Sequence, residues 1–388
     1  MKENLSTLEK VPVETMKGLT LHRQSPSCRY AAPALFKFGF MPSLLGVRPK
    51  RKDMDFRMKD YRVTFVKTKE AQLIEHGWVE SPLADDEVFG QNILSMISTG
   101  SERGGFTTEF KPEQYPMETG SSSIARVIEA GKSVTGLKPG DLFFNHCHHT
   151  LYVKAKADDT IPLPEGLAPE KALFARYAGV SMTSIFKANI KPVEKVIVTG
   201  LGLVGNMCAQ VLQSFGFDVY AVDPSSERRE AAVKVGLRHV GASLAEFEGL
   251  SYAAGALMEC SGNENALLSS LDYIRKGGEI YQIGVPWRKN ADWDAHSLLR
   301  SLFYGFISIH GGWEWSIPRK SGDFAPHSSN GHILAAMQLL AQGRMNVTEE
   351  MYELRNPKDC NAVYSEISIP RMSPTCMILD WRTFTGTQ

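Results

Sequence analysis

The sequence has no excess of either charge, no long apolar run and no paired cysteines. Its 43 Lys and Arg residues balance 43 Asp and Glu residues, so no global field attracts nucleic acid or anionic lipid. No apolar stretch approaches the length of a membrane span. The six cysteines contain no C-x-x-C pair, which indicates neither a disulfide framework nor a structural zinc lobe. We therefore expect no nucleic-acid partner and no membrane partner.

The first residues also lack the pattern of a targeting peptide. Residues 1–17 mix Glu and Lys without an apolar core and without the acid-poor character of a transit peptide. A cytoplasmic protein is therefore expected. Its apolar content of 43% and charged content of 22% are typical of globular proteins, and its 388 residues suit two domains.

A glycine-rich turn is the most informative feature that is present. Residues 195–199, Lys-Val-Ile-Val-Thr, form an apolar, β-branched run of the kind that makes a buried strand. Gly200, Gly202 and Gly205 then complete the pattern G-x-G-x-x-G. The first glycine permits a tight turn, the second lets the backbone approach a pyrophosphate, and the third lets the next helix pack on the strand. The N–H groups that begin this helix would face the phosphates.

The cofactor that this turn predicts is NAD(H). Asp223 ends a second apolar run, where a carboxylate accepts hydrogen bonds from both ribose hydroxyls and repels a 2′-phosphate. A helical segment at 227–235, an apolar run that ends at 262 and the stretch 277–284 continue the alternation of strand and helix. The residues predicted to bind the dinucleotide are Gly200, Gly202, Leu203, Val204, Gly205, Asp223, Arg228, Ser261, Gly284 and Val285.

The region before the glycine turn has the sequence pattern of a small antiparallel β-domain, with short β-type segments separated by Gly, Pro and Asp. These segments are 61–66, 71–74, 92–97, 123–129, 141–145 and 151–155. A helical segment near 170–187 follows, and Lys191-Pro marks the boundary before the first strand of the dinucleotide unit. A sixth strand is expected at 306–310.

The two ends of the chain are less regular. Prolines interrupt residues 1–58, which we interpret as an irregular N-terminal extension. Residues 318–331 are polar and rich in Gly, Ser and Pro, so a mobile loop is expected there. Residues 332–342 have apolar side chains at helical spacing, and the closing segment to Trp381 is again β-like.

The order of these segments resembles the medium-chain dehydrogenase/reductase superfamily from about residue 60 to the end. Local stretches agree, among them Gly131-Lys-Ser-Val-Thr-Gly-Leu-Lys-Pro-Gly-Asp141, Leu163-Pro-Glu-Gly-Leu167 and Gly284-Val-Pro286. The resemblance implies an α/β fold, with a GroES-like β-rich catalytic domain and a Rossmann doubly wound parallel sheet. The implied boundaries are 59–187, completed by 318–388, for the substrate domain and 188–317 for the Rossmann domain, with hydride transfer between them. A homo-oligomer, either a dimer or a tetramer, is also expected.

The chain departs from the zinc-dependent members of this superfamily at every ligand position that can be placed. Where they have Cys-Gly-Thr-Asp it has Thr99-Gly-Ser-Glu102, where they have Gly-His-Glu it has Gly120-Ser-Ser122, and the later ligand falls near Ala175 or Arg176. Residues 146–149, His-Cys-His-His, point alternately to opposite faces if the segment is extended, so they do not supply a tetrahedral set. No metal is therefore expected.

A site without zinc needs a general base and a hydrogen-bonding or positive group to stabilise the alkoxide. The candidate catalytic residues are Ser101, Glu102, Arg176, Tyr177 and His149, and the candidate substrate residues are Thr99, His148, Trp313 and Trp315. Two alternatives stay open. Instead of acting in catalysis, Arg176 could pair with Glu102 as a structural replacement for the metal. Instead of binding substrate, Trp313 and Trp315 could fill a core or a subunit interface.

The function predicted from these features is that of an NAD(H)-dependent, zinc-independent dehydrogenase or ketoreductase. Its small-molecule substrate would carry a secondary alcohol or ketone on a polar ring, as in a sugar, glycoside or cyclitol, because an indole face packs well on a sugar ring. The zinc-free branches that it resembles act on glycosides and cyclitols or on chlorophyllide. An ene or quinone reductase and a chlorophyllide-type dehydrogenase remain alternatives, as does a dinucleotide-binding protein without turnover.

Overall fold

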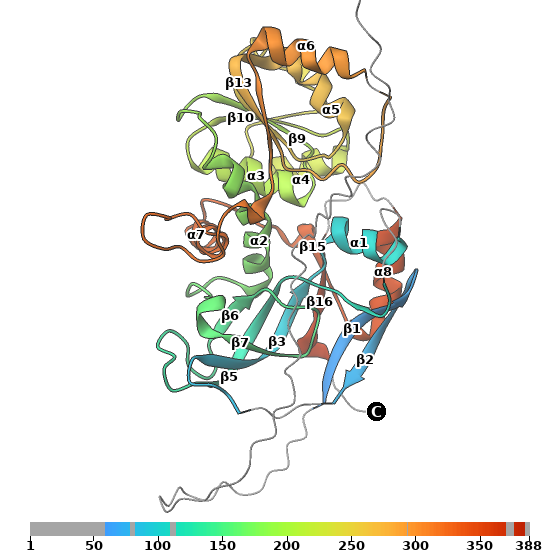
Figure 1. Cartoon of the computed structure of the whole chain (residues 1–388), viewed down its shortest axis with the longest axis vertical. Helices are drawn as coiled ribbons and strands as arrows, with labels where there is room; N and C mark the ends of the chain where they lie inside the picture. The colour runs from blue at the N-terminus through green and yellow to red at the C-terminus, as the bar shows by residue number, and fades with distance from the viewer. Residues whose placement is uncertain (1–58, 78–81, 109–113, 293, 370–375, 385–388) are drawn as a thin grey trace, which may run out of the picture. The chain divides into compact units, whose positions relative to one another are not determined.

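Antiparallel β-structure and one parallel sheet account for most of the architecture (Figure 1). The computed structural model describes residues 59–77, 82–108, 114–292, 294–369 and 376–384. The predicted N-terminal extension at 1–58 lies outside these residues. Within them, no helix combines the length and the apolar character needed to cross a membrane.

The mainly antiparallel part contains two sheets, ordered β2-β1-β4 and β15-β16-β3-β5-β6-β8, with β7 paired to β3 and β15 parallel to β16. The chain's closing strand β16 runs antiparallel to β3, so that Ile378 lies opposite Met96. This pairing brings the end of the chain back to the first strands. The strands are β1 Asp60–Lys67, β2 Glu70–His76, β3 Glu87–Met96, β4 Met117–Glu118, β5 Ser123–Ala130, β6 Leu142–Asn145, β7 Tyr152–Lys156, β8 Ile161–Pro162, β15 Tyr352–Arg355 and β16 Cys376–Asp380.

The parallel sheet has six strands in the order β11-β10-β9-β12-β13-β14. This is the order of a doubly wound dinucleotide-binding sheet, in which the strand order reverses beside the first strand, β9. The predicted α/β fold class, with a β-rich part and a Rossmann sheet, is therefore confirmed. Its elements are β9 Lys195–Thr199, α3 Leu203–Ser214, β10 Asp218–Val222, α4 Ser226–Lys234, β11 His239–Gly241, β12 Ala254–Glu259, α5 Glu264–Ser269, β13 Ile274–Gln282, α6 Ala295–Gly305 and β14 Ser308–Gly311.

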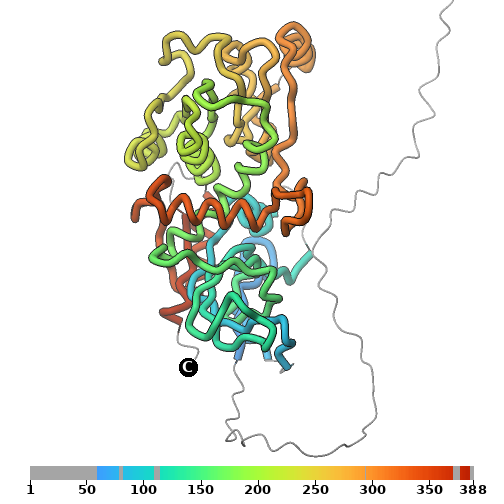
Figure 2. The backbone as a smooth tube through the Cα atoms, turned by 90° about the vertical axis from the view of Figure 1, so that its left-hand side faces the viewer, coloured from blue at the N-terminus to red at the C-terminus, as the bar shows by residue number. Residues whose placement is uncertain are grey.

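Helix α2 (Pro169–Ile185) joins the two kinds of sheet along the chain, and most of its residues are buried. It begins with Pro169, whose missing N–H costs nothing at the first helical position. Helix α7 (Ser329–Ala341) packs closely on it, since a Cβ at Gly179 would lie 2.8 Å from Cγ1 of Ile333. Figure 2 shows α7, in orange-red, along its length.

Residues Thr99–Thr107 form helix α1. Two local predictions are wrong. Helix α7 begins within the expected polar loop, because Ser328 caps it by accepting a hydrogen bond from Gly331 N–H at 3.1 Å. The closing segment is not uniformly β-like, because α8 (Cys360–Ser368) interrupts it and buries one face.

Candidate functional site

The glycine turn after β9 has the geometry of a nucleotide cradle. A Cβ on Gly205 would lie 1.7 Å from the carbonyl oxygen of Gly200, so only glycine fits there. Gly200 has a φ of +83°, and a Cβ there would collide with Ser261. A Cβ on Gly202, in contrast, would meet nothing within 4 Å. The backbone at Gly202 is therefore open to a ligand.

Helix α3 starts at this open position, and no side chain caps its first N–H groups. Its first turn holds no acidic residue, so the positive end of the helix dipole is not neutralised locally. An anion such as a pyrophosphate fits this arrangement. The residues at the turn thus fit the dinucleotide that the sequence predicts, including Leu203 and Val204 at the start of the helix.

A buried carboxylate fixes the neighbouring loops. Glu259, at the end of β12, is fully buried and accepts hydrogen bonds from Ser261 N–H at 2.8 Å and Gly262 N–H at 3.0 Å. The side chain of Gln282, at the end of β13, donates to it at 2.5 Å. Gly284 approaches so closely that its Cβ would lie 2.4 Å from Gly262 N. The loops after β12 and β13 are therefore held side by side at one edge of the sheet.

Asp223 lies just after β10, at the position predicted for the ribose. Its carboxylate is 1% exposed and accepts from Leu201 N–H at 2.7 Å and Ser225 N–H at 2.9 Å. Arg228 donates to the same carboxylate at 3.2 Å. Asp223 therefore ties the glycine turn to the start of α4.

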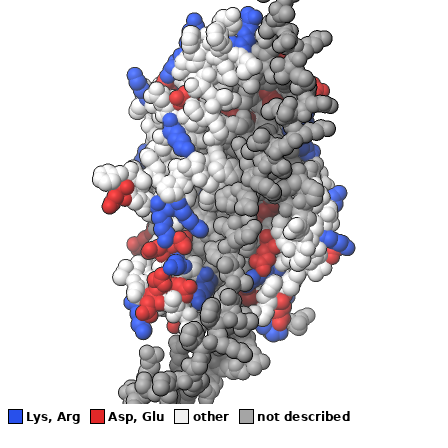
Figure 3. Space-filling model, viewed as in Figure 1, with Lys and Arg blue, Asp and Glu red and all other residues white. Residues whose placement is uncertain are grey.

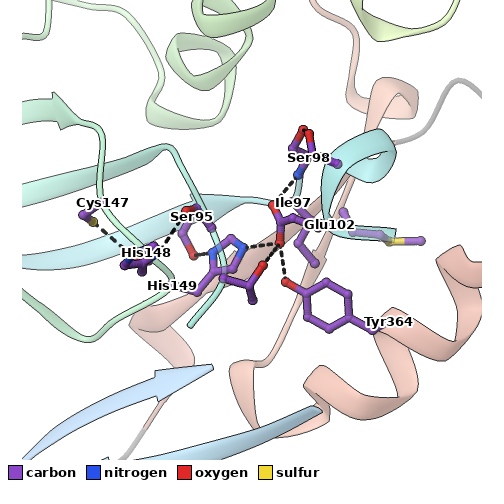
Figure 4. A network of polar contacts seen from close by, with 12 residues as sticks. Ser95, Ile97, Ser98, Glu102, Cys147, His148, His149 and Tyr364 are labelled. Carbon is purple, nitrogen blue, oxygen red and sulfur yellow. Dashed lines mark hydrogen bonds and ion pairs between the residues drawn. The ribbon is translucent and has the colours of Figure 1, made fainter. Parts of the chain in front are cut away.

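A second polar centre lies where β3 ends and α1 begins (Figure 4). Glu102 is buried there, and one oxygen accepts from His149 Nε2 at 3.0 Å, Thr119 Oγ1 at 2.9 Å and Tyr364 Oη at 2.5 Å. The other oxygen accepts from Ser98 N–H at 2.6 Å. Glu102 thus has four donors and is not open to solvent.

His149 extends this network on its other side. Its Nδ1 lies 2.7 Å from Ser95 Oγ, which also accepts from the indole N–H of Trp381 at 2.8 Å. Gly120 has a φ of +104°, and its Cβ would lie 2.5 Å from His149 N. Both ring nitrogens of His149 are therefore occupied, and the backbone around the ring is closely packed.

The surroundings perturb the acidity of this centre. Burial raises the pKa of Glu102, but the imidazole of His149 and hydrogen bonds from His149, Tyr364 and Ser98 outweigh that effect and hold the pKa below its usual value of 4.5. Burial and the Glu102 charge raise the pKa of Tyr364 well above 10.0. Glu102 is therefore a structural anion, and its environment does not favour the predicted role of general base.

The predicted pairing of Arg176 with Glu102 is wrong. Arg176, on α2, instead forms a bidentate ion pair with Glu314 of the short 3-10 turn Glu314–Ser316. Its guanidinium carbon also lies 5.7 Å from the ring centroid of Trp315. The physical reason is that Glu102 is enclosed by four other donors, whereas Glu314 approaches Arg176 from a segment far along the chain.

The remaining predicted residues have varied surroundings. Tyr177 donates its hydroxyl to Ile97 O at 3.3 Å and is 7% exposed, and burial raises its pKa well above 10.0. This environment favours a structural role.

Ser101 is exposed on the first turn of α1, with its Oγ 3.1 Å from Ser98 Oγ. Thr99 begins the same helix, and the Nδ1 of the exposed His148 lies 3.1 Å from Gly120 O.

The start of α1 lies against the loop that follows β13. A Cβ on Gly100 would be 3.4 Å from the indole nitrogen of Trp287. Trp287 comes two residues after Val285, which is predicted to contact the cofactor and is 46% exposed. The hydroxyls of Ser98 and Ser101 are thus placed near one end of the predicted cofactor site. Trp313, 64% exposed, has no such link among the described contacts.

The residues present do not fit a zinc ion. Within the described ranges, no three His, Cys, Asp or Glu side chains gather in a way that would hold a metal. Burial raises the pKa of Cys147 to about 11, which keeps the thiol protonated, and its sulfur already contacts Ser123 Oγ at 3.0 Å. His146 lies 3.3 Å from Asn330 Oδ1 and His149 contacts Glu102, so the two imidazoles do not converge. We derive no step that uses zinc.

Several residues of these centres escaped sequence reasoning. Tyr364 carried a usable signal, since the buried residues of α8 recur at helical spacing. Other contacts join residues far apart in the chain and leave no local pattern. The residues that the sequence did not single out are Ser95, Glu259, Gln282, Trp287, Arg319, Asn330, Tyr364 and Trp381.

Comparisons with known proteins agree with this fold. The sequence profile of a family described as "Zinc-binding dehydrogenase" matches residues 204–317. L-threonine 3-dehydrogenase from Caldanaerobacter subterraneus is 26% identical over 209 residues, 44% of this chain and 60% of that protein. Sorbitol dehydrogenase from Halalkalibacterium halodurans is 25% identical over 214 residues, 45% of this chain and 62% of that protein. These alignments thus span about three fifths of the relatives.

A solved structure extends the agreement over most of the fold. Galactitol-1-phosphate dehydrogenase from Escherichia coli superposes with a TM-score of 0.68 at 16% identity, covering 82% of this chain and 99% of that one. At this identity the likeness concerns the fold alone. The family profile adds a sequence likeness to zinc-binding dehydrogenases over residues 204–317.

Proposed function

We propose that this protein is an NAD(H)-dependent dehydrogenase or ketoreductase that acts without zinc on a secondary alcohol or ketone of a polar cyclic substrate, such as a sugar, glycoside or cyclitol. The observation that carries the proposal is the packing of the first turn of α1 against Trp287, on the loop that follows the predicted cofactor residues Gly284 and Val285. This turn carries the exposed Ser101, whose Oγ lies 3.1 Å from Ser98 Oγ. The relatives named above, which are a threonine and a sorbitol dehydrogenase, agree with chemistry at a CH–OH group.

The cofactor proposal rests on the glycine turn and on Asp223. The uncapped helix α3 and the open position at Gly202 suit a pyrophosphate. The carboxylate of Asp223 disfavours a 2′-phosphate, which supports NAD over NADP. When bound, the dinucleotide would supply or accept the hydride.

The protein's own residues would handle the substrate oxygen and its proton. Ser101 Oγ would hydrogen-bond to the substrate hydroxyl, and because Ser101 is exposed, its hydroxyl would pass the proton to water. Glu102 would hold the start of α1 in place through Ser98 N–H. This assignment makes Ser101 the residue that touches substrate, and Glu102, Tyr177 and His149 positioning residues.

The absence of a fitting ligand set supports zinc independence. Thr99 and Ser121 offer no thiolate or imidazole at two expected ligand positions, and Arg176 carries a positive charge near the third. We therefore expect activity that is unchanged by a chelator. Loss of activity on dialysis against a chelator, restored by zinc alone, would contradict the proposal.

A binding assay and a substrate screen test the function. NADH fluorescence should titrate to one site per chain, with weaker binding of NADPH, and cyclic polyols with NAD should raise absorbance at the reduced-nicotinamide band. Ser101→Ala should lower kcat roughly 100-fold and leave the NADH Kd unchanged. Ser365→Ala, on the exposed side of α8, is the matched control.

The same screen decides between the alternatives. Consumption of NADPH with an enone or quinone, and none with polyols, would indicate the reductase. Turnover of a chlorophyllide alone would indicate that branch of the superfamily. Tight NADH binding without turnover of any substrate would indicate a binding protein.

We also propose a homodimer, with a second copy on the edge of the parallel sheet. Strand β14 is at that edge, and the adjoining α6 segment exposes Leu299 at 62%, Phe303 at 75% and Phe306 at 73%. An edge strand can pair antiparallel with its own copy about a twofold axis. Phe303→Asp should shift the mass measured by light scattering from dimer to monomer. If the protein without the substitution already has the mass of a monomer, the homodimer proposal is wrong.

No nucleic-acid partner is proposed, and a cytoplasmic location remains our expectation. On the face shown in Figure 3, the Lys and Arg side chains of the described residues lie among Asp and Glu side chains. A mixed surface of this kind gives little attraction for a polyanion.

A further inference from the structure

A cluster of hydrogen-bond donors surrounds His146, which follows β6. Arg176 of α2 and Arg319 both lie close enough for their charges to act on this imidazole. Asn330, in the first turn of α7, places its Oδ1 3.3 Å from His146 Nε2, and its backbone N–H donates to Arg319 O at 3.1 Å. The cluster thus joins residues of three separate elements, and the proposed function above does not use it.

The charges of this cluster do not balance. Glu314 binds both terminal nitrogens of Arg176. Arg319 has no carboxylate partner among the residues that the structure describes. Burial, followed by the charges of Arg176 and Arg319, lowers the pKa of His146 to about 3, so its imidazole is neutral near pH 7. The positive charge of Arg319 is therefore not compensated within the cluster.

The unused hydrogen-bonding groups of the cluster are donors. Asn330 is 9% exposed, and its buried Nδ2 has no partner. The buried Nε atoms of Arg176 and Arg319 have none either. Buried donors are nearly always paired in folded proteins, because an unpaired one costs free energy. Unpaired donors beside an uncompensated positive charge are complementary to an anion.

We propose that Arg319 and Asn330, supported by Arg176, bind an anionic group of the substrate, either a carboxylate or a phosphate. This inference rests on the proposed function and narrows its substrate class to acidic or phosphorylated cyclic polyols. The cluster adjoins the Glu102 network, because the backbone of Ser121 hydrogen-bonds to His146 and the neighbouring Gly120 packs against His149. The nearby ring of Trp315, 47% exposed and in cation–π contact with Arg176, offers an apolar face for the sugar ring.

Calorimetric titration of the full chain tests this proposal without relying on turnover. D-glucuronate, glucose 6-phosphate and glucose serve as probes, each with and without NADH. At least one anion should bind about 10-fold or more tightly than glucose, and the tighter of the two names the group as carboxylate or phosphate. Arg319→Gln should weaken that binding about 10- to 100-fold, as expected for the loss of a charge-assisted contact.

Two further variants keep the test decisive. Lys320→Gln removes the same charge from the neighbouring residue, whose side chain pairs with Asp159 at the surface, and should leave the Kd within about twofold. Asn330→Leu should weaken anion binding while its melting temperature reports whether the fold is intact.

Equal affinity for glucose and both anions would overturn the proposal, and so would equal effects of Arg319→Gln and Lys320→Gln. Oxidation of neutral polyols with no preference for acidic ones would overturn this inference while leaving the proposed function standing. Tight anion binding without turnover of any polyol would support this inference and contradict the proposed function.

Discussion

The glycine turn and the Glu102 network are built on opposite principles. At the turn, Gly202 faces open space and the first N–H groups of α3 have no side-chain partner. At the network, Glu102 has four donors and both nitrogens of His149 are engaged. Unsatisfied groups indicate where a ligand binds, and fully satisfied buried groups indicate what holds the protein together. The comparison therefore assigns binding to the turn and support to Glu102.

Substitution of Gly205 should have the largest effect. In Gly205→Val the new Cβ would lie 1.7 Å from Gly200 O, so the strand and helix must separate. We expect the Kd for NADH to rise more than about 100-fold and the melting temperature to fall. Fluorescence titration and calorimetry measure the two effects.

Gly202→Ala is the matched control for that substitution. Its Cβ would meet nothing within 4 Å, so the free energy of unfolding should change by no more than about 1 kcal/mol. NADH binding should still weaken, since the methyl group enters the space expected for the pyrophosphate. Unchanged NADH affinity in Gly202→Ala would remove the turn from the binding site.

Removal of the Glu102 carboxylate should mainly lower stability. Glu102→Ala leaves the buried groups of His149, Thr119 and Tyr364 without their acceptor. The free energy of unfolding should fall by about 3 kcal/mol, as measured by urea denaturation. Glu165→Ala, at an exposed position, should change it by less than about 0.5 kcal/mol. A Glu102→Ala protein of normal stability without activity would instead restore Glu102 as a catalytic residue.

The pH dependence of stability should show a smaller effect of the same carboxylate. The pKa of Glu102 is lowered in the folded protein from 4.5, so its ionised form stabilises the fold above that pH. This contribution is lost as pH falls through the lower, folded-state pKa. The difference in unfolding free energy between the unchanged protein and Glu102→Gln should therefore shrink below about pH 4. A difference that grows with acidity would indicate that Glu102 is protonated in the fold.

Local pattern explains what could be predicted from the sequence. Gly200, Gly202 and Gly205 are constrained by contacts within one strand, turn and helix, so their spacing, together with the strand and helix patterns around them, indicated the nucleotide cradle. Helix α8 followed a visible periodicity, but its short length and the strands on either side favoured a β-like interpretation.

The polar centres depend on contacts between distant segments. Tyr364 reaches Glu102 from 262 residues away, and Glu314 reaches Arg176 from 138 residues away. Such partners are fixed by how strands and helices pack, because no local propensity links them. For this reason the sequence identified Arg176 and Glu102 as unusual residues but left their pairing with each other open as an alternative to catalysis.

The ion pair between Arg176 and Glu314 also couples the choice of residue at these two positions. A single change of Arg176 to a neutral residue would leave the carboxylate of Glu314, which is only 16% exposed, without its counter-charge. Replacement of both residues by a neutral pair should therefore be tolerated better than replacement of either residue alone.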